Sequence, residues 1–236
     1  THIYNLAKDK NKDLAFVYRI HDVPNPDKLE ELAIFLRAIG YEFEVHKGIV
    51  KATAINKLLK EIEGTPEENL IKTATIRSMA KAVYSTKNIG HFGLAFKFYT
   101  HFTSPIRRYP DLMAHRLLRK HLDGSHIGPK ELQQYEQLCI KSSQREMEAV
   151  SAERDSIKFK QVEYLMNRIG ETFAGVITGV ADWGIYVQES TCMADGMVRL
   201  ATIKSDYFEH EASKYRIKGQ KTGKTYSLGD KVTVKL

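Results

Sequence analysis

Apolar side chains recur every three or four residues along the first two thirds of the chain, which is the spacing of helices that bury one face. Capping residues, prolines and glycines divide this stretch into separate elements. The pattern predicts helices over 26–39, 54–62, 65–84 and 104–121, a buried strand over 14–20, and a loop with a strand over 88–99. Thr65 and Glu68 have the spacing of a capping box at the start of the third helix. Pro110 falls inside the fourth, where it should remove one hydrogen bond and bend the helix.

The stretch from Pro129 to about Met166 has hardly a residue that would break a helix. It predicts either one long helix or two abutting ones. Its apolar residues recur at roughly helical spacing: Leu132, Tyr135, Leu138, Cys139, Met147, Val150 and Ile157. Such a stripe favours packing against a core.

At Gly170 the pattern changes to short runs in which apolar and polar residues alternate. These runs predict strands over 172–178, 183–188, 196–200, 215–217, 224–227 and 231–236. Short strands separated by glycine turns are typical of a small barrel or sandwich. We therefore expect a domain boundary within 167–170. The chain opens without Met and closes on a strand, which predicts a fragment of a longer protein.

The chain has 36 basic and 29 acidic side chains, a formal net charge of +7 and a pI of about 9.2. This balance weakly favours a polyanionic partner. Cys139 and Cys192 are too few for a disulfide framework, so a reducing compartment is expected. No apolar run reaches the ~20 residues of a membrane-spanning helix, and no signal peptide opens the chain. These features predict a cytoplasmic protein without a membrane partner.

The densest polar segment runs from Tyr99 to Arg116 and holds three arginines, two histidines and three Ser or Thr hydroxyls. On a helix, Arg107, Asp111 and His115 would share one face. Hydroxyls at a helix start, together with paired guanidiniums, can bind a phosphate. An N-capped surface helix with an Arg–Asp pair explains the same residues without any ligand. Both hypotheses stay open on the residues alone.

Residues 101–116, which read HFTSPIRRYPDLMAHR, closely resemble the signature of the RNase II/RNase R family of exoribonucleases, also called the RNB family. The upstream phrases 15–22, 76–85 and 88–95 and the downstream phrase 152–155 agree with this family, in the expected order. The resemblance covers essentially the whole chain and is strongest to the bacterial RNase R branch.

The resemblance implies an α+β chain. The helix-rich C-terminal part of an RNB catalytic domain is expected over residues 1–167, followed over 168–236 by an S1-type OB-fold barrel whose last strand is missing. Members of this family are processive, hydrolytic 3′→5′ exoribonucleases that release nucleoside 5′-monophosphates. The implied partner is single-stranded RNA, and a monomer is expected.

The family's Mg²⁺ ions are held by clustered aspartates in the first half of the RNB domain, which this chain lacks. Mg²⁺ prefers several carboxylate and water oxygens in an octahedral array. The first aspartates of this chain are scattered among lysines and turn residues: Asp9, Asp13, Asp22 and Asp27. We therefore expect no metal ligand in this chain, and no nuclease activity from the chain alone.

By the same resemblance, Arg107 occupies the position of the family's active-site arginine. A guanidinium can meet two oxygens of a phosphate as negative charge develops on them. Ser104 is a candidate RNA-binding residue at the cap of the expected helix. Arg108 and Tyr109 are expected either to bind the RNA backbone or to pair within the fold. Asp111 is expected to orient Arg107 or Arg108 rather than to bind metal.

Three further residues of the resemblance have less direct roles. His115 and Arg116 are expected to pack or to support the site rather than to act on RNA. Glu153 is interpreted either as a residue of the RNA channel or as part of an exposed helix face.

The segment from Thr172 resembles an S1 domain, whose usual aromatic pair corresponds to Trp183 and Tyr186 here. Their flat faces can stack on bases, each stack being worth ~1–3 kcal/mol. Arg199 is a further RNA-binding candidate, although it stands where many S1 domains have His. Phe173 is expected to pack in the barrel instead. Five basic residues either attract phosphates or form a solvated loop: Lys214, Arg216, Lys218, Lys221 and Lys224.

Two alternative functions stay open at this point. A family member with a decayed aspartate cluster would bind RNA without cutting it. A stable proteolytic piece would have no function of its own. Clustered aspartates upstream of this chain would favour the nuclease.

Overall fold

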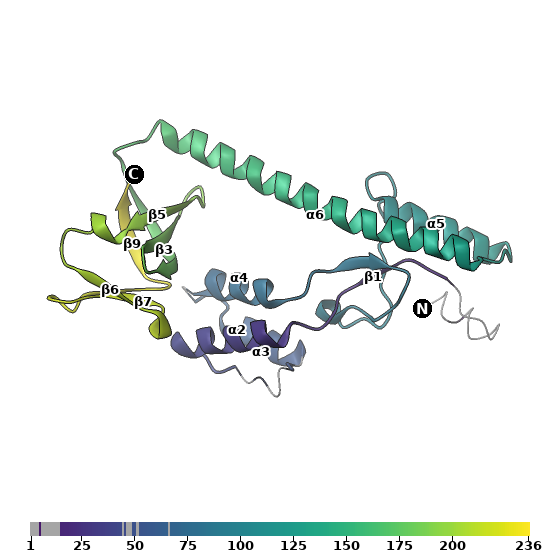
Figure 1. Ribbon diagram of the computed structural model, residues 1–236, viewed down its shortest axis with the longest axis horizontal. Helices are drawn as coiled ribbons and strands as arrows, with labels where there is room; N and C mark the ends of the chain where they lie inside the picture. The colour runs from purple at the N-terminus through teal and green to yellow at the C-terminus, as the bar shows by residue number, and fades with distance from the viewer. Residues whose placement is uncertain (1–4, 6–14, 44, 46–48, 51, 66) are drawn as a thin grey trace. The chain divides into compact units, whose positions relative to one another are not determined.

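The computed structural model describes residues 5, 15–43, 45, 49–50, 52–65 and 67–236 (Figure 1). Two compact units divide these residues. The first unit contains the described residues up to Asn25 and Met79–Ser151, and the second contains Pro26–Ser78 and Ala152–Leu236. Both helices and sheets are present, so the predicted α+β class is confirmed.

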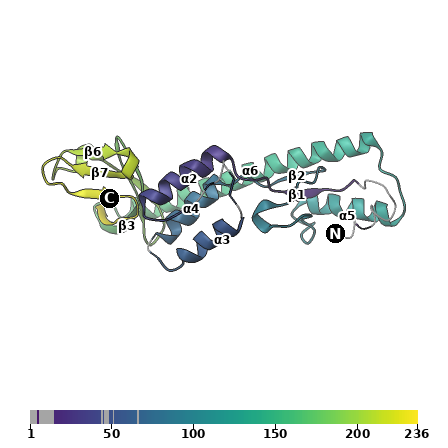
Figure 2. The same cartoon turned by 90° about the horizontal axis from the view of Figure 1, so that it is seen from below.

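The first unit joins a small antiparallel ladder to two helices. Its regular elements are β1 (Tyr18–Ile20), β2 (Val83–Ser85), the 3₁₀ turn η1 (Phe92–Leu94), α5 (Tyr109–Leu122) and the first part of α6 (Pro129–Met166). Figures 1 and 2 both show α5 beside the N-terminal half of α6. This pairing positions the loop before α5 against the side of α6.

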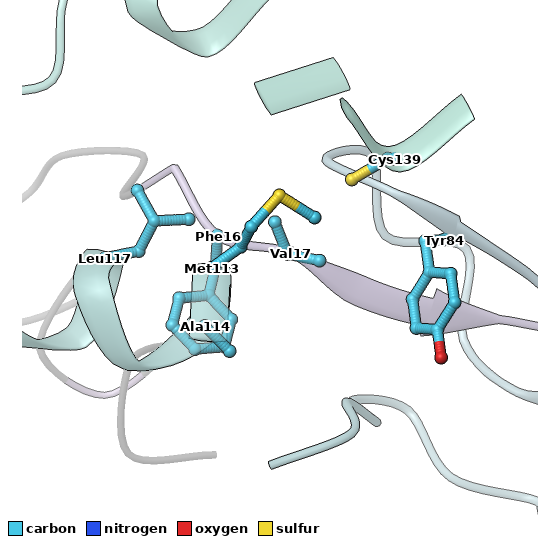
Figure 3. Close-up of a cluster of buried hydrophobic side chains, with 7 residues drawn as sticks. All are labelled: Phe16, Val17, Tyr84, Met113, Ala114, Leu117 and Cys139. Atoms are coloured by element: carbon cyan, nitrogen blue, oxygen red, sulfur yellow. The ribbon is translucent and has the colours of Figure 1, made fainter. Parts of the chain in front are cut away.

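The core of the first unit explains this arrangement. Met113, Ala114 and Leu117 form one buried face of α5, because residues three and four apart share a side of a helix. Figure 3 shows them converging with residues from other elements: Phe16, Val17, Tyr84 and Cys139. Burying a side chain such as Leu117 contributes ~1.5–3 kcal/mol. Cys139 comes from α6, so this core fastens α5 to that helix.

The second unit contains three helices and two sheets. Its helices are α2 (Pro26–Ala38), α3 (Ala52–Glu61), α4 (Glu68–Ser78) and the rest of α6. One sheet has the order β5-β4-β3-β9, from β3 (Thr172–Ala181), β4 (Gly184–Glu189), β5 (Asp195–Arg199) and β9 (Lys231–Lys235). The other has the order β6-β7-β8, from β6 (Phe208–Glu211), β7 (Arg216–Gly219) and β8 (Thr225–Ser227). Two 3₁₀ turns, η2 (Leu200–Thr202) and η3 (Ala212–Lys214), complete the unit.

Alternate residues of the two sheets form one hydrophobic core of this unit. Ile177, Ile185 and Val187 come from the first sheet, and Phe208 and Ile217 come from the second. The residues between them, such as Tyr186, therefore face the other side of the sheet. The predicted small-barrel architecture is open: both sheets keep free edges in the described part of the chain.

The predicted helix over 65–84 is wrong beyond Ser78. Residues 83–85 instead form β2, which pairs with β1, and Tyr84 lies opposite Arg19. The capping box is also wrong: the Thr65 hydroxyl donates to the Ile62 carbonyl, and the Glu68 carboxylate accepts from the Gly64 N–H at 2.9 Å. Pro66, which belonged to that predicted cap, lies outside the described residues.

The predicted bend at Pro110 is wrong because α5 begins at Tyr109 rather than at Ser104. Pro110 therefore lies in the first turn, where its missing N–H leaves no helical hydrogen bond unmade. The buried strand predicted over 14–20 is regular only over Tyr18–Ile20, and Leu14 lies outside the described residues. Between 88 and 99 the described chain forms turns and isolated bridges, without the predicted strand.

Residues 129–166 form one helix, α6, which settles the choice between one helix and two. The core interpretation of its apolar stripe is right near Cys139, which is buried. It is wrong further along, where Met147, Val150 and Ile157 are exposed. The strand β6 was absent from the predicted set because its four residues read Phe-Glu-His-Glu, with a single apolar side chain.

Candidate nucleic-acid interface

Asp111 holds the loop before α5 in place. Its side chain is completely buried, and Oδ2 accepts a hydrogen bond from the Ser104 N–H at 2.7 Å. The same oxygen accepts from the Arg108 guanidinium at 2.9 Å. The Ser104 carbonyl accepts from the Arg107 and Arg108 N–H groups at 3.2 and 3.0 Å. Asp111 thus orients Arg108, one of the two arginines that the sequence left open.

Arg107 lies at the turn before α5, and its side chain is exposed. Among the described residues no carboxylate pairs with its guanidinium. The predicted common helix face of Arg107, Asp111 and His115 is wrong, because Arg107 precedes the helix. Arg107 is therefore available to a ligand, whereas Arg108 is anchored.

A cavity of about 690 Å³ opens beside this loop in the first unit. It is lined by Tyr84, Arg107, Arg108, Tyr109, Pro110, Leu138, Lys141, Ser142, Arg145, Glu146 and Ala149. Three of the predicted site residues, Arg107, Arg108 and Tyr109, meet there, whereas Ser104 is not part of the lining. Four lining side chains carry positive charge and one carries negative charge, so the cavity suits an anion.

The carboxylate of Glu146 is neutralised within the wall. Arg19 contacts both of its oxygens, with Nη2 donating to Oε1 at 3.0 Å. The same guanidinium lies 4.5 Å above the centre of the Tyr84 ring, a cation–π contact. Because Arg19 already neutralises the carboxylate of Glu146, this carboxylate does not offset the positive charge of the other side chains that line the cavity.

Tyr84 and His101 share a hydrogen bond of 2.7 Å between the hydroxyl and Nδ1. Burial raises the pKa of Tyr84 to about 12. Burial also lowers the pKa of His101, and the nearby Arg108 and Arg19 lower it further. At neutral pH Tyr84 thus keeps its proton and His101 stays uncharged, so neither adds a charge at the cavity.

His115 supports the segment before α5. Its Nε2 bonds to the Phe102 carbonyl at 2.7 Å, and its ring stacks on Phe102 with centroids 4.1 Å apart. These contacts agree with the expectation that His115 packs or supports the site, which stays a prediction. Arg116 and Glu153 are both exposed, so the exposed-face interpretation of Glu153 agrees with the structure.

The sequence did not predict five residues that line this cavity or pair with its lining: Arg19, Tyr84, Lys141, Arg145 and Glu146. Lys141 and Arg145 are one helical turn apart on α6, and that spacing was the only local signal. Arg19 and Glu146 are separated by 127 residues, so no local pattern could have paired them.

The second candidate surface is the outer face of the sheet in the second unit. The Trp183 side chain is 61% exposed, and its Nε1–H donates to the Tyr186 hydroxyl at 3.1 Å. Arg199 lies opposite Gly184, and Tyr186 lies opposite Met197, so Arg199 and Tyr186 point to the same face. The three predicted residues therefore belong to one surface region.

Gly179 gives the Tyr186 ring its place on that face. A Cβ atom at Gly179 would lie 3.1 Å from the Tyr186 ring, closer than ordinary contact. A side chain at residue 179 would therefore push the ring away from the strand by a few tenths of an ångström, and glycine lets the ring lie close against it. Phe173, in contrast, is buried beneath the Arg168 guanidinium at 4.9 Å, so its predicted packing role is confirmed.

The basic hairpin region is partly neutralised by its own unit. Arg216 bonds to Glu211, and Lys214 lies 3.9 Å from the same carboxylate. The hydrogen bond from Arg216 lowers the pKa of Glu211, which therefore stays ionised. Lys218 lies opposite Glu209 in the ladder. The solvated-loop interpretation fits these pairs better than a phosphate site does.

The described residues do not fit the magnesium site of the family resemblance. No group of three or more His, Cys, Asp or Glu side chains that could hold a metal ion occurs among them. Asp9 and Asp13 lie outside the described part, and Asp22 and Asp27 belong to different units. A search of the described helices for one able to cross a membrane finds none.

The chain matches the sequence model of one protein family and is similar to several known proteins. The model of the RNB domain matches residues 6–124. Ribonuclease R of Aquifex aeolicus is 41% identical over 221 residues, covering 93% of this chain and 31% of that protein. Ribonuclease R 1 of Lactococcus lactis is 36% identical over 226 residues, covering 94% and 28%. The chain thus spans about a third of the length of these relatives.

A solved structure is similar over nearly the whole chain. Mycoplasma genitalium RNase R in complex with ribose-methylated single-stranded RNA matches with a TM-score of 0.83 and 31% identity. The match covers 99% of this chain and 37% of that one. The similarity therefore includes both the cavity of the first unit and the sheets of the second.

Proposed function

Because the chain belongs to the RNB domain family, we propose that it is part of a 3′→5′ exoribonuclease that hydrolyses RNA processively to nucleoside 5′-monophosphates. The relatives named Ribonuclease R support the enzyme class. A relative bound to single-stranded RNA supports the substrate. Residues 1–167 would complete the catalytic domain and residues 168–236 would form an S1-type domain, in a monomeric, cytoplasmic protein.

The observation that carries this proposal is the exposed guanidinium of Arg107, which pairs with no carboxylate of the described residues, at an electropositive cavity. Hydrolysis of a phosphodiester builds negative charge on the phosphoryl oxygens, and a guanidinium can donate to two of them. Arg107 would therefore stabilise the transition state more than the bound substrate. Arg108, held by buried Asp111, would position the RNA backbone beside it.

Magnesium is the metal that the family resemblance implies. The described residues do not form such a site, so other residues of the whole protein would hold the ions. This chain would contribute binding and charge stabilisation. On the second unit, Trp183 and Tyr186 would stack on bases, and Arg199 would contact the backbone beside them.

The test is single-turnover cleavage by the whole enzyme, measured beside an RNA-binding isotherm for each variant. Arg107→Ala should lower the cleavage rate by at least ~10²–10³, the usual cost of losing one donor to a developing oxyanion. Binding should change much less, because the interaction forms mainly in the transition state. Arg107→Lys should recover little, since an ammonium cannot make the planar two-point contact.

Arg108→Ala is the matched comparison, because it removes a neighbouring guanidinium with a different proposed role. It should weaken RNA binding and lower the rate less than Arg107→Ala does. Equal losses of binding and rate for Arg107→Ala would make that residue a phosphate clamp only. A whole protein that binds RNA normally and never cleaves it would support the inactive RNA-binding alternative.

A further inference from the structure

The second wall of the cavity is the side of α6, and it presents two cations that none of the roles proposed so far uses. Lys141 and Arg145 are four residues apart, so they lie one turn apart on the same face. Both side chains are exposed. They face the same cavity as Arg107, which comes from the loop before α5.

Some of the charged side chains in this wall have an ion-pair partner among the described residues and others do not. Arg145 forms an ion pair with Glu148, but both side chains are largely exposed, at 70% and 60%, so solvent weakens that pair. Within the described residues Lys141 has no carboxylate partner. Glu146, the acidic residue of the lining, already has its partner in Arg19. Lys141 and Arg107 therefore supply charge that no lining residue cancels.

The volume of the cavity and its uncharged lining residues indicate which chemical class of ligand fits. A volume of about 690 Å³ is in the range of small-molecule sites. Tyr84, Tyr109 and Leu138 supply aromatic and apolar surface beside the cations. A ligand with an anionic end and a flat, partly apolar end matches both kinds of surface. A nucleotide has this composition.

We propose that Lys141 and Arg145 bind a nucleotide phosphate in this cavity, next to the phosphate assigned to Arg107. This inference rests on the proposed function for its setting and adds two phosphate-binding residues from α6. The phosphate comes either from the RNA chain or from a free nucleoside 5′-monophosphate, the product of the proposed reaction. Both share the same anionic oxygens, and the test separates them.

The experiment is calorimetric titration of the 236-residue chain with three probes: AMP, adenosine and the trinucleotide ApApA. The variants are Lys141→Gln, Arg145→Gln and the double substitution. Lys130→Gln is the matched control, because Lys130 is an exposed lysine of α6 outside the cavity lining. Each affected probe should bind about fivefold more weakly per removed cation, a loss of roughly 1 kcal/mol.

Salt dependence provides an independent measure of the same contacts. Each phosphate contact removed from a single strand should reduce the slope of log K against log salt by ~0.7. Adenosine, which has no phosphate, should bind all variants alike. Weakened AMP binding assigns the site to a monophosphate, and weakened ApApA binding alone assigns it to the RNA chain. Unchanged binding of both probes by the double variant overturns the proposal.

Single-turnover cleavage by the whole enzyme distinguishes the failure of this inference from the failure of the proposed function. If Arg107→Ala slows cleavage while the α6 double variant leaves AMP and ApApA binding unchanged, the α6 site is rejected and the role of Arg107 stands. If the α6 variants weaken binding and Arg107→Ala cleaves RNA at the unchanged rate, the phosphate site on α6 stands and the proposed role of Arg107 is rejected. Equal melting temperatures for all variants would confirm that each effect is local.

Discussion

The cavity of the first unit and the sheet face of the second both carry predicted RNA-binding residues, but they present different chemistry. The cavity offers guanidinium and ammonium groups, one of them fixed by the buried carboxylate of Asp111. The sheet face offers two exposed rings, Trp183 and Tyr186, with Arg199 beside them. Cations meet phosphates, which every nucleotide has, whereas rings meet the faces of bases.

The two regions also differ in what holds them in shape. A buried, charged hydrogen-bond network organises the loop before α5, and its removal would leave unpaired charge in the interior. Strand pairing and the missing side chain of Gly179 organise the sheet face. We infer that the cavity is built for positioning and the sheet face for tolerant stacking. The following predictions test that difference, from the largest expected effect to the smallest.

The largest effect is expected for cleavage itself. The 236-residue chain should bind single-stranded RNA and release no nucleotides from it when Mg²⁺ is added. Both binding regions are present, but the described residues hold no cluster of metal-ligating side chains. Chromatography of the products of long incubations would measure this. Mg²⁺-dependent release of nucleoside monophosphates by the purified chain would contradict it.

A smaller but still large effect is expected when Asp111 is replaced. Asp111→Ala should lower the free energy of unfolding by ~3–5 kcal/mol, because it leaves the Arg108 charge without its buried partner. Urea denaturation measures this change. Asp123→Ala is the matched control, since Asp123, the residue that follows the same helix, pairs with Arg119 at 2.9 Å in an exposed position.

The control pair is exposed on both sides, so its loss should cost at most ~0.5 kcal/mol. Equal effects of the two substitutions would mean that the buried carboxylate is not what holds the loop. The cavity and the sheet face would then no longer differ in how they are built.

The smallest effect is expected for stacking on the sheet face. Trp183→Ala should weaken RNA binding by ~1–3 kcal/mol, similarly for every sequence, because each base has a face to stack on. Trp183 is the single tryptophan of the chain, so quenching of its fluorescence reports on that face directly. Tyr207→Ala, another exposed aromatic in the second unit, is the control and should leave binding unchanged.

Salt sharpens the contrast between the regions. Trp183→Ala should leave the salt dependence of RNA binding unchanged, since stacking releases no counterions. Substitution of cavity cations should reduce that dependence. A reduced salt slope for Trp183→Ala would mean that the two surfaces do not differ as proposed.

Local signals were enough for several parts of the structure. Helix α2 begins at Pro26 and ends near Gly40 as predicted, because a proline start and a glycine at φ 89° act on their immediate neighbours. The strands β3, β4 and β9 lie where alternation predicted them. The polar signature around Arg107 was also visible, since its residues are adjacent along the chain.

Other parts depended on contacts between distant residues. Tyr84 has the sequence environment of a helix end, yet it lies in β2, which pairs with β1, and its N–H donates to the Ser143 hydroxyl of α6 at 2.9 Å. In the sequence Pro110 predicts an interruption of a helix. In the structure the buried Asp111 binds the preceding loop, and the helix begins only at Tyr109, so Pro110 lies in its first turn. The apolar stripe of α6 continues beyond the buried Cys139, but in the described part of the chain the side chains of Met147, Val150 and Ile157 stay exposed.

The sequence by itself determined the family, the positions of most elements and the arginines at the centre of the candidate site, because those signals lie within a few residues of one another. The local conformation of the turn before α5 decided that Asp111 anchors Arg108 rather than Arg107, and only the tertiary structure decided that Arg19 neutralises Glu146. It also brought Lys141 and Arg145 to the same cavity as Arg107. The charge of a cavity is a sum over side chains from separate elements, and packing alone sets which side chains enter that sum.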